Sequence, residues 1–535
     1  MSNHMSVTFC LLLSVCAGSA QAQWIADATV NTPVAVATGD QTSPVMRPSL
    51  DGGVWIAYAD NALGGSGYKH VVQRLTATGF SALGAGTIMS PSRTNSGVFT
   101  YDMRADNVGG AVVAFDNNGV FAQRVDANGN VLWPVGGVQV TNNTTSLGPR
   151  VAALADGSYV VAWNATGLVT MQRITSSGAL GTSFTISNGG NYLAISDLLP
   201  GASGGEVIAL WVVGETTSAS TSRKGLRLQK WNGANVAQWN GGAPVAIYTS
   251  QASPSKSIQN GYFPAMISNG NGGAIVAWYD NGAARNAWLQ AVSSSGQLRF
   301  AAEGLAMSTT PSTTELRLSA SVAYDQPSDS FVVSYVRSNT NQSMWSVNAQ
   351  RVSSEGLLLW GGGSGQAFTP MAASQPSFVT SSEAPGPDTV ISWLQAGASQ
   401  STQVFSLRAN ALGETVWLPS PSGVGISGTP KGRLAVANTA GSSMLIASWV
   451  DGTFGVADIK AQNILPTGRL GPGCDAIDFN ENGVFPEDQD VVDFFNVLAG
   501  SVCFACGDID FNNNGVYPED QDVIDFFAVL AGGDC

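Results

Sequence analysis

The stretch Val54-Trp55-Ile56-Ala57-Tyr58 is the first of eight short apolar runs that each end in an aromatic residue. Short apolar runs rich in Val and Ile predict buried β-strands. The other seven runs are Ala111-Val112-Val113-Ala114-Phe115, Val160-Val161-Ala162-Trp163, Val207-Ile208-Ala209-Leu210-Trp211, Ala274-Ile275-Val276-Ala277-Trp278, Val332-Val333-Ser334-Tyr335, Val390-Ile391-Ser392-Trp393 and Leu445-Ile446-Ala447-Ser448-Trp449.

A second strand-like segment follows each run. Each of these segments carries one Gln, or in one copy Leu, and these residues are 49 to 61 positions apart in successive copies: Gln73, Gln123, Gln172, Gln229, Gln290, Gln350, Leu407 and Gln462. In seven copies a Gly stands six residues later, where a tight turn needs a positive φ: Gly79, Gly129, Gly178, Gly296, Gly356, Gly413 and Gly468. Several of these turns lead into an aromatic residue and another β run, so each copy predicts about four short antiparallel strands.

Four antiparallel strands repeated in this way predict a mainly β fold, an eight-bladed β-propeller over residues 23–468. The eighth copy lacks a last strand, which the segment from Thr32 to Ala37 can supply. A seven-bladed ring with one irregular copy is the alternative. The body resembles the divergent, Gly- and Trp-rich propellers of secreted bacterial proteins.

The repeated aromatic and Gln residues are interpreted as structural. An aromatic at the same place in every copy suits packing, and a repeated Gln suits a hydrogen bond between neighbouring blades. Ligand contacts are expected instead in long loops that differ between copies: Gly214–Lys224, Gln251–Gly261 and Ser338–Trp345.

The net charge of −14 lies entirely in the last 62 of 535 residues, which hold 14 acidic residues and no Lys or Arg. The remaining 473 residues hold 23 acidic and 23 basic side chains. A neutral body with an acidic tail excludes a general nucleic-acid binder, which needs a basic face. The acidic tail indicates cation binding.

The tail, residues 474–535, is a duplication. The segments 474–503 and 506–535 match at 22 of 30 positions, and each contains an Asp-x-Asn-x-Asn-Gly loop. Oxygen-bearing side chains at positions 1, 3 and 5 can converge on one ion, and Gly at position 6 permits a sharp turn. Each loop precedes a predicted helix whose apolar stripe contains two Phe residues, Phe494 and Phe495 or Phe526 and Phe527. These phenylalanines are expected to form a two-helix core rather than a docking surface.

This tandem of loops and helices resembles a dockerin, specifically the EF-hand-like, Cys-flanked type of planctomycete secreted proteins. The resemblance implies two calcium ions and a cohesin-like or cell-surface anchoring partner. The implied ligands are Asp478, Asn480, Asn482, the Val484 carbonyl and Asp490 in the first loop, and Asp510, Asn512, Asn514, the Val516 carbonyl and Asp522 in the second. Position 12, an acid in ordinary dockerins, is Gln489 or Gln521 here, so Asp488 and Asp520 are alternative last ligands.

The ends of the chain indicate export. An apolar run from Val7 to Ala17 precedes Ala20-Gln21-Ala22, which predicts a signal peptide over residues 1–22, with lipidation at Cys16 as the alternative. No later stretch is apolar enough to predict a transmembrane helix. We therefore expect a secreted, extracellular or cell-surface protein, with residues 469–473 linking its two domains.

Four cysteines remain after such cleavage, and an exported chain favours disulfides over a zinc site. Three pairings are open. The pairing Cys474–Cys503 and Cys506–Cys535 is favoured because each duplicated unit would then close on itself.

The sequence assigns no catalytic residue. A catalytic triad or a histidine metal site would have to use His70, the one histidine after residue 22, and this residue is expected at the surface. We therefore expect a non-catalytic propeller that binds a polysaccharide, another polymer or a protein. The alternative is a carbohydrate-active enzyme, either a glycosidase or a polysaccharide lyase, and two or three carboxylates in the central channel would favour it.

Overall fold

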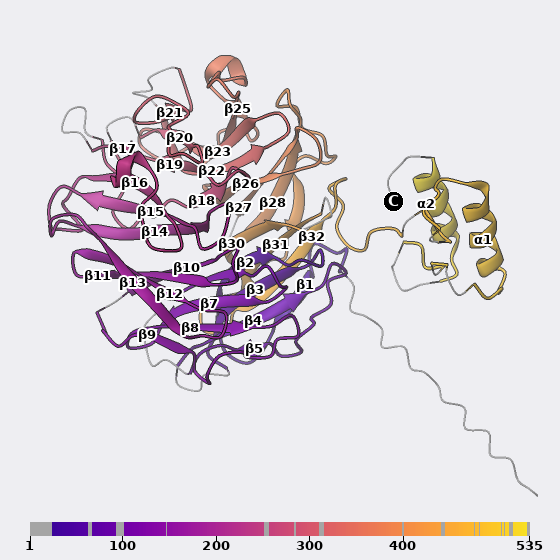
Figure 1. Cartoon of the computed structure of the whole chain (residues 1–535). Helices are drawn as coiled ribbons and strands as arrows, with labels where there is room; N and C mark the ends of the chain where they lie inside the picture. Colours follow the sequence, from indigo (N-terminus) through magenta and orange to yellow (C-terminus); the bar gives the residue numbers. More distant parts are fainter. Residues whose placement is uncertain are drawn as a thin grey trace, which may run out of the picture.

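The computed structural model describes residues 24–531 apart from 63–66, 92–100, 146, 251–255, 283–284, 310–314, 398–400, 440–443, 476, 481, 504–505, 508 and 513–516. The predicted signal peptide, residues 1–22, lies outside the described residues. Eight four-stranded antiparallel sheets form the blades of a ring, and two helices lie together beside it (Figure 1). The predicted mainly β, eight-bladed propeller is confirmed, and the seven-bladed alternative is wrong.

The blades follow one another along the chain, with each sheet ordered as its strands occur in sequence. Blades 1 to 4 are β2 (Gln41–Pro48), β3 (Val54–Asp60), β4 (Lys69–Leu75) and β5 (Thr87–Ile88); β6 (Tyr101–Ala105), β7 (Ala111–Asp116), β8 (Val120–Val125) and β9 (Val138–Thr141); β10 (Leu147–Ala153), β11 (Tyr159–Ala165), β12 (Leu168–Ile174) and β13 (Leu180–Ser187); β14 (Leu193–Pro200), β15 (Val207–Gly214), β16 (Lys224–Trp231) and β17 (Val245–Tyr248).

Blades 5 to 7 repeat this order, and blade 8 takes its outer strand from the beginning of the described chain. They are β18 (Met266–Ser268), β19 (Ala274–Tyr279), β20 (Ala287–Val292) and β21 (Leu305–Ala306); β22 (Glu315–Asp325), β23 (Ser330–Asn339), β24 (Trp345–Val352) and β25 (Gln366–Ala367); β26 (Pro376–Glu383), β27 (Thr389–Ala396), β28 (Thr402–Ala409) and β29 (Ser422–Gly425); and β30 (Lys431–Asn438), β31 (Leu445–Asp451), β32 (Asp458–Ile464) and β1 (Thr32–Ala35).

The ring closes where the N-terminal strand joins the last blade. β1 pairs antiparallel with β32, with Thr32 opposite Ala461. The side chain of Asn31 adds hydrogen bonds to the Val424 carbonyl (2.7 Å) and to the Gln462 side chain (3.0 Å). The prediction that the segment from Thr32 supplies the missing strand is therefore confirmed.

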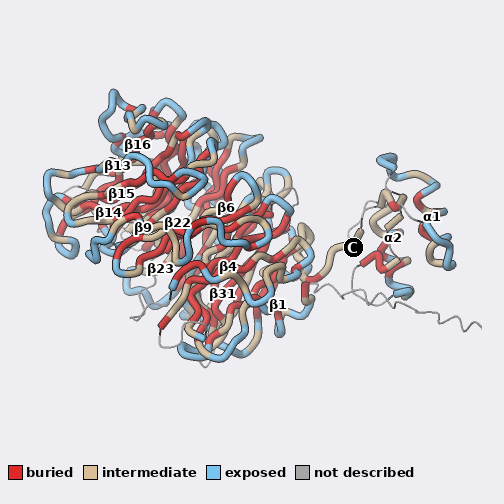
Figure 2. Tube along the Cα trace, turned by 60° about the horizontal axis from the view of Figure 1, so that its bottom comes forward, coloured by how far each residue is buried: buried red, intermediate tan, exposed pale blue. Residues whose placement is uncertain are grey.

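The eight aromatic residues that end the apolar runs are packing residues, as predicted. Those in β15, β19, β27 and β31 are Trp side chains with at most 1% exposure, and the other four are exposed by 5% or less. Figure 2 shows buried residues along the strands of the ring, with exposed residues gathered in the connecting loops. The second strand of each blade is thus the centre of its apolar core.

A second set of apolar side chains joins each blade to the next. The indole of Trp239, in the β16–β17 connection, lies on the turn glycine Gly296 of blade 5, and its Nε1 donates to the Ser294 carbonyl (2.9 Å). Equivalent contacts join Trp24 to Gly79, Leu83 to Gly129, Trp133 to Gly178, Phe300 to Gly356, Trp360 to Gly413 and Trp417 to Gly468. We call this contact the blade interlock.

Polar side chains make the remaining junction, between blades 3 and 4. Asn235 stands where the other turns have Gly, and it adopts a φ of 62°. Its side chain accepts a hydrogen bond from Arg173 Nε (2.6 Å) and donates one to Thr182 Oγ1 (2.8 Å). This explains why the fourth copy lacks the turn glycine.

The repeated Gln acts within a blade, so the prediction of a bond between blades is wrong. In blade 4, Gln229 Oε1 accepts from the Trp239 backbone N–H (2.9 Å) and Gln229 Nε2 donates to the Ala243 carbonyl (2.8 Å). Gln350 and Trp360 repeat this arrangement in blade 6. The Gln therefore positions the tryptophan, and the tryptophan makes the contact with the next blade.

The tail contains the two predicted helices, α1 (Asp488–Leu498) and α2 (Asp520–Leu530). In each, the acidic residues of the first turn lie near the positive end of the helix dipole. Among the described helices, none has both the length and the apolar character needed to cross a bilayer.

A glycine substitution at an interlock tests its role in stability. A Cβ added at Gly296 (φ +85°) would lie 2.5 Å from the Trp239 ring, whereas one at Gly386 (φ +68°) would meet no atom within 4 Å. Gly386→Ala should therefore cost ~1 kcal/mol from backbone strain alone, and Gly296→Ala roughly 2 kcal/mol more from overpacking. Thermal unfolding of the two variants measures the difference, and equal losses would contradict the interlock.

Candidate functional site

Four phenylalanines form the core of the tail. Phe494 of α1 and Phe526 of α2 are fully buried, and their rings stack with centroids 4.1 Å apart. Phe479 and Phe511, which occupy position 2 of the two loops, are buried against them. The sequence reasoning missed these two loop residues, and each of them contacts the buried phenylalanines of both helices.

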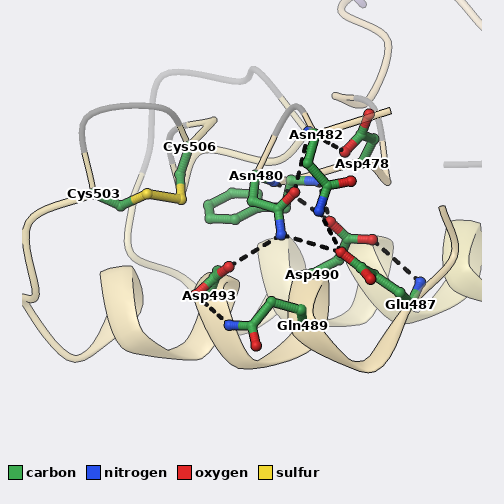
Figure 3. Close-up of a disulfide and its surroundings, with 10 residues drawn as sticks. Asp478, Asn480, Asn482, Glu487, Gln489, Asp490, Asp493, Cys503 and Cys506 are labelled. Atoms are coloured by element: carbon green, nitrogen blue, oxygen red, sulfur yellow. Dashed lines mark hydrogen bonds between the residues drawn. A yellow bond between two sulfur atoms is a disulfide. The ribbon is translucent and has the colours of Figure 1, made fainter. Parts of the chain in front are cut away.

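Four predicted ligands of the first loop lie together around its turn: Asp478, Asn480, Asn482 and Asp490 (Figure 3). The two carboxylate oxygens of Asp478 accept from the backbone N–H groups of Asn482 (3.1 Å) and Gly483 (2.9 Å). Asn482 Oδ1 accepts from the Val484 N–H (2.7 Å). The side-chain oxygens at positions 1, 3 and 5 therefore all accept backbone N–H groups of the turn, and calcium binding by them stays a prediction.

Asp490 joins α1 to this loop. Its carboxylate is fully buried, with one oxygen accepting from the Phe479 N–H (2.9 Å) and the other from the Glu487 N–H (3.2 Å). Asp522, also fully buried, accepts in the same way from the Glu519 N–H (3.1 Å). Asp488 and Asp520 are exposed. Of the alternative last ligands, Asp490 and Asp522 are the pair directed at the loops.

Two further acidic residues face the first loop and were not predicted. Asn480 Nδ2 donates to Asp493 Oδ2 (3.2 Å) and to Glu487 Oε1 (3.4 Å). Gln489, at position 12, donates to the other Asp493 oxygen (2.8 Å) instead of turning to the loop. The available signal was the spacing of Asp490 and Asp493, because residues three apart lie on one face of a helix.

The second loop repeats the first where it is described. Asn512 Nδ2 donates to Asp525 (3.1 Å), and Gln521 donates to the other Asp525 oxygen (2.8 Å). Burial, followed by the charges of Asp510 and Glu519, raises the pKa of Asp522. The predicted ligands Asn514 and Val516 lie outside the described residues.

The donors of the first loop fit a hard cation, which prefers carboxylate, amide and carbonyl oxygens. Within the described ranges, no three acidic, His or Cys side chains converge on one point, so asparagine and backbone oxygens must complete any metal site. The Asn480 amide nitrogen donates to two carboxylates, which places positive character where a cation would bind. A rotation of that amide would present its oxygen instead.

The cysteine pairing differs from the favoured one. Cys503 is bonded to Cys506, with the two Cα atoms 5.4 Å apart (Figure 3). Both residues lie in the connection between the two helices, so the bridge closes a short loop within this connection and does not close either repeat on itself. Cys474 is also disulfide-bonded.

The central channel of the propeller carries an ion network on the first strands of blades 2 to 5. Arg104 of β6 donates to Asp102 Oδ1 (3.1 Å) and to Asp197 Oδ1 of β14 (2.6 Å). The other oxygens of these aspartates accept from the Val151 N–H (3.1 Å) and the Met266 N–H (2.8 Å). Burial raises the pKa of both aspartates, although neighbouring arginines act in the opposite direction. Both channel carboxylates are thus held by hydrogen bonds.

His70 is buried, so the prediction of a surface histidine is wrong. It is 3% exposed, with its ring 4.7 Å from that of Tyr101, measured between centroids. Its Nδ1 lies 3.1 Å from Ser90 Oγ. Its ring also lies 5.3 Å from that of Phe115, so His70 packs against the next blade, which the flanking Tyr and Lys did not indicate.

A pocket of about 520 Å³ opens between blades 6 and 7 and contains three carboxylates. Asp325 is paired with Arg351 (3.0 Å) and Asp388 with Arg408 (2.8 Å). The side chain of Glu383, at the end of β26, makes no hydrogen bond or ion pair with any described residue. Partial burial and the charge of Asp325 raise the pKa of Glu383.

Comparison with known proteins gives matches to solved structures. No protein-family model and no curated protein matches the chain. The BP39L lectin from Burkholderia pseudomallei has a TM-score of 0.40 at 12% identity, covering 71% of this chain and 97% of the lectin. An α-L-arabinanase from Penicillium chrysogenum has a TM-score of 0.36 at 14% identity, covering 61% and 95%. A protein of unknown function from Dyadobacter fermentans also has a TM-score of 0.36, at 11% identity, covering 81% and 97%.

Removal of Arg104 should destabilise the ring strongly. Arg104→Met leaves Asp102 and Asp197 without this guanidinium, and their side chains are only 7% and 8% exposed. Breaking a buried pair typically costs about 3–5 kcal/mol. The control Arg223→Met removes an ion pair whose side chains are 38% and 36% exposed, where the cost is about 0–1 kcal/mol. Similar unfolding temperatures for the two variants would refute the proposed importance of the network.

Proposed function

We propose that this is a secreted, non-catalytic propeller that binds a polymer or a protein, and that its dockerin-like tail attaches it to a cohesin-like or cell-surface partner. Asp102 and Asp197 are two channel carboxylates, the feature expected to favour an enzyme, but their bonds support the non-catalytic assignment. Asp102 and Asp197 each bond to Arg104 and to a backbone N–H, so neither is available as a free acid or base. The apolar run at Val7–Ala17 and the tail disulfide support export.

Exposed phenylalanines on the tail helices support the anchoring role. Phe495 and Phe527 are 40% and 42% exposed, with their ring centroids 5.9 Å apart. Val492 and Ile524, on the same two helices, are 49% and 58% exposed. The expected phenylalanine core therefore holds for Phe494 and Phe526, whereas the other pair provides an apolar surface for an anchoring partner.

Calcium binding in the tail is part of the proposal. The first loop offers Asp478, Asn480, Asn482, the Val484 carbonyl and Asp490, and the second repeats this set. The bound ions would neutralise part of a tail that has no Lys or Arg. Asp490 and Asp522 connect each loop to its helix, so ion binding would also fix the loop on the helix.

Calorimetry with the full-length chain tests the calcium sites. Wild-type protein should bind two ions with a Kd on the order of 10⁻⁴ M, the range of extracellular modules. Asp490→Asn should remove one binding event, because Asn keeps one oxygen but loses the charge. The control Asp488→Asn changes an exposed neighbour and should keep both events. Absence of binding in wild type, or loss of a site in the control alone, would contradict the assignment.

A second candidate function, a glycosidase, is favoured by Glu383. A carboxyl group with a raised pKa near an ionised carboxylate is the arrangement of a general acid and its partner. Asp325, whose charge acts on Glu383, is held by Arg351 in the same pocket. This pair lies between two blades, whereas the sequence reasoning expected such carboxylates in the channel.

An assay for released reducing ends separates the two functions. Under the proposed function, wild-type protein releases none from a polysaccharide panel. If reducing ends appear and Glu383→Gln lowers their rate by about 100-fold or more, the glycosidase replaces our proposal. The control Glu355→Gln alters an exposed turn residue and should leave any rate unchanged.

A further inference from the structure

A second pocket, of about 640 Å³, opens between blades 3 and 4. Its walls come from the β11–β12 hairpin, the connection from β13 to β14, the long loop after β15 and the segment before β18. The loop after β15 contributes Thr217, and it is one of the three loops in which ligand contacts were expected. This volume lies within the range of about 300–1,000 Å³ that is typical of small-molecule sites.

Asn164 supplies a fixed hydrogen-bond donor at this pocket. Its Oδ1 accepts from the Ile195 N–H (2.7 Å), which orients the amide. Its Nδ2 makes no hydrogen bond to any described residue, and a Cβ on the adjacent Gly148 would lie 3.0 Å from it. Gly148 therefore leaves this donor uncovered.

Tyr192 supplies a positioned aromatic ring. Its backbone N–H donates to the Thr216 carbonyl (2.8 Å), and its carbonyl accepts from the Gly214 N–H (2.8 Å), so the long loop holds it. The Lys224 ammonium lies 5.4 Å from the ring centroid, and it is buried and donates to the Ser222 carbonyl (3.0 Å). Lys224 thus supports the ring from outside the pocket. Phe263, half-buried, lines the pocket as a second aromatic.

The lining is uncharged. Among its described members are the hydroxyls of Thr166, Ser187 and Thr217, which bond to no described residue. None of the described lining residues has an acidic or basic side chain. An ionic ligand would lose hydration here without gaining a charged partner. The pocket between blades 6 and 7, with its three carboxylates, has the opposite character. Hydroxyl and amide groups beside aromatic rings match a ligand that carries many hydroxyls and no charge.

We propose that the pocket between blades 3 and 4 binds a short segment of a neutral polysaccharide. The Asn164 amide donates to a sugar hydroxyl, and the rings of Tyr192 and Phe263 contact the apolar face of a sugar ring. This inference rests on the proposed binding function of the propeller and names its ligand class. The long loop after β15 makes the site specific to one blade junction.

Calorimetry of the full-length protein with cellohexaose, mannohexaose, xylohexaose and, as a charged probe, oligogalacturonate tests the inference. We expect binding of at least one neutral oligosaccharide and none of oligogalacturonate. Asn164→Asp keeps the acceptor for the Ile195 N–H but removes the donor, and it should weaken binding about tenfold or more. The matched control Asn271→Asp places the same charge on an exposed turn and should bind as wild type does.

The outcomes separate the pocket from the general function. If both variants bind a neutral oligosaccharide equally well, the pocket is not the binding site, but the proposed binding function is still supported. Binding of oligogalacturonate alone, or of no saccharide, would overturn the neutral-ligand inference, while a protein partner would still satisfy the general function. Release of reducing ends would contradict the non-catalytic function, and the Asn164→Asp result would still decide the pocket. Unchanged unfolding temperatures of both variants establish that the comparison is made on folded protein.

Discussion

The propeller depends on one contact, the packing of an apolar side chain from each blade onto the turn glycine of the next. At seven of the eight junctions the side chain is Trp, Phe or Leu, and the glycine has a positive φ. A Cβ at these glycines would lie 2.5 to 3.2 Å from that side chain. Trp24 makes this contact at the last junction, so the strand exchange through β1 and the interlock close the ring together.

The same contact explains which parts of the fold the sequence could predict. A positive φ favours glycine, so seven turn glycines recur six residues after the Gln or Leu407, and Asn235 takes the eighth place. A repeat does not show whether a residue's partner lies in its own copy or in the next. For that reason Gln229 and its equivalents were assigned to the wrong partner, and the burial of His70 against the next blade was missed.

The candidate sites divide in the same way. Local spacing predicted the tail loops and left Asp488 and Asp490 as alternative last ligands. Only the folded helix shows which of the two points to the loop, and it is Asp490. Glu487 and Asp493 contact the loop only in the folded structure, where both accept a hydrogen bond from Asn480. The Cys503–Cys506 bridge reflects proximity within one connection, which the symmetry of the duplication concealed. The propeller pockets arise from loops that do not repeat, so no repeat pattern could identify their ligands.

The central claim is that a neutral ring held by its own interlocks carries a separate, acidic tail that responds to calcium. Differential scanning calorimetry of the full-length chain, with calcium and with a chelator, tests this claim most directly. We predict two unfolding transitions, a large one from the propeller and a small one from the tail, with calcium raising the temperature of the small one alone. A shift of the large transition with calcium, or a single merged transition in both conditions, would contradict the account.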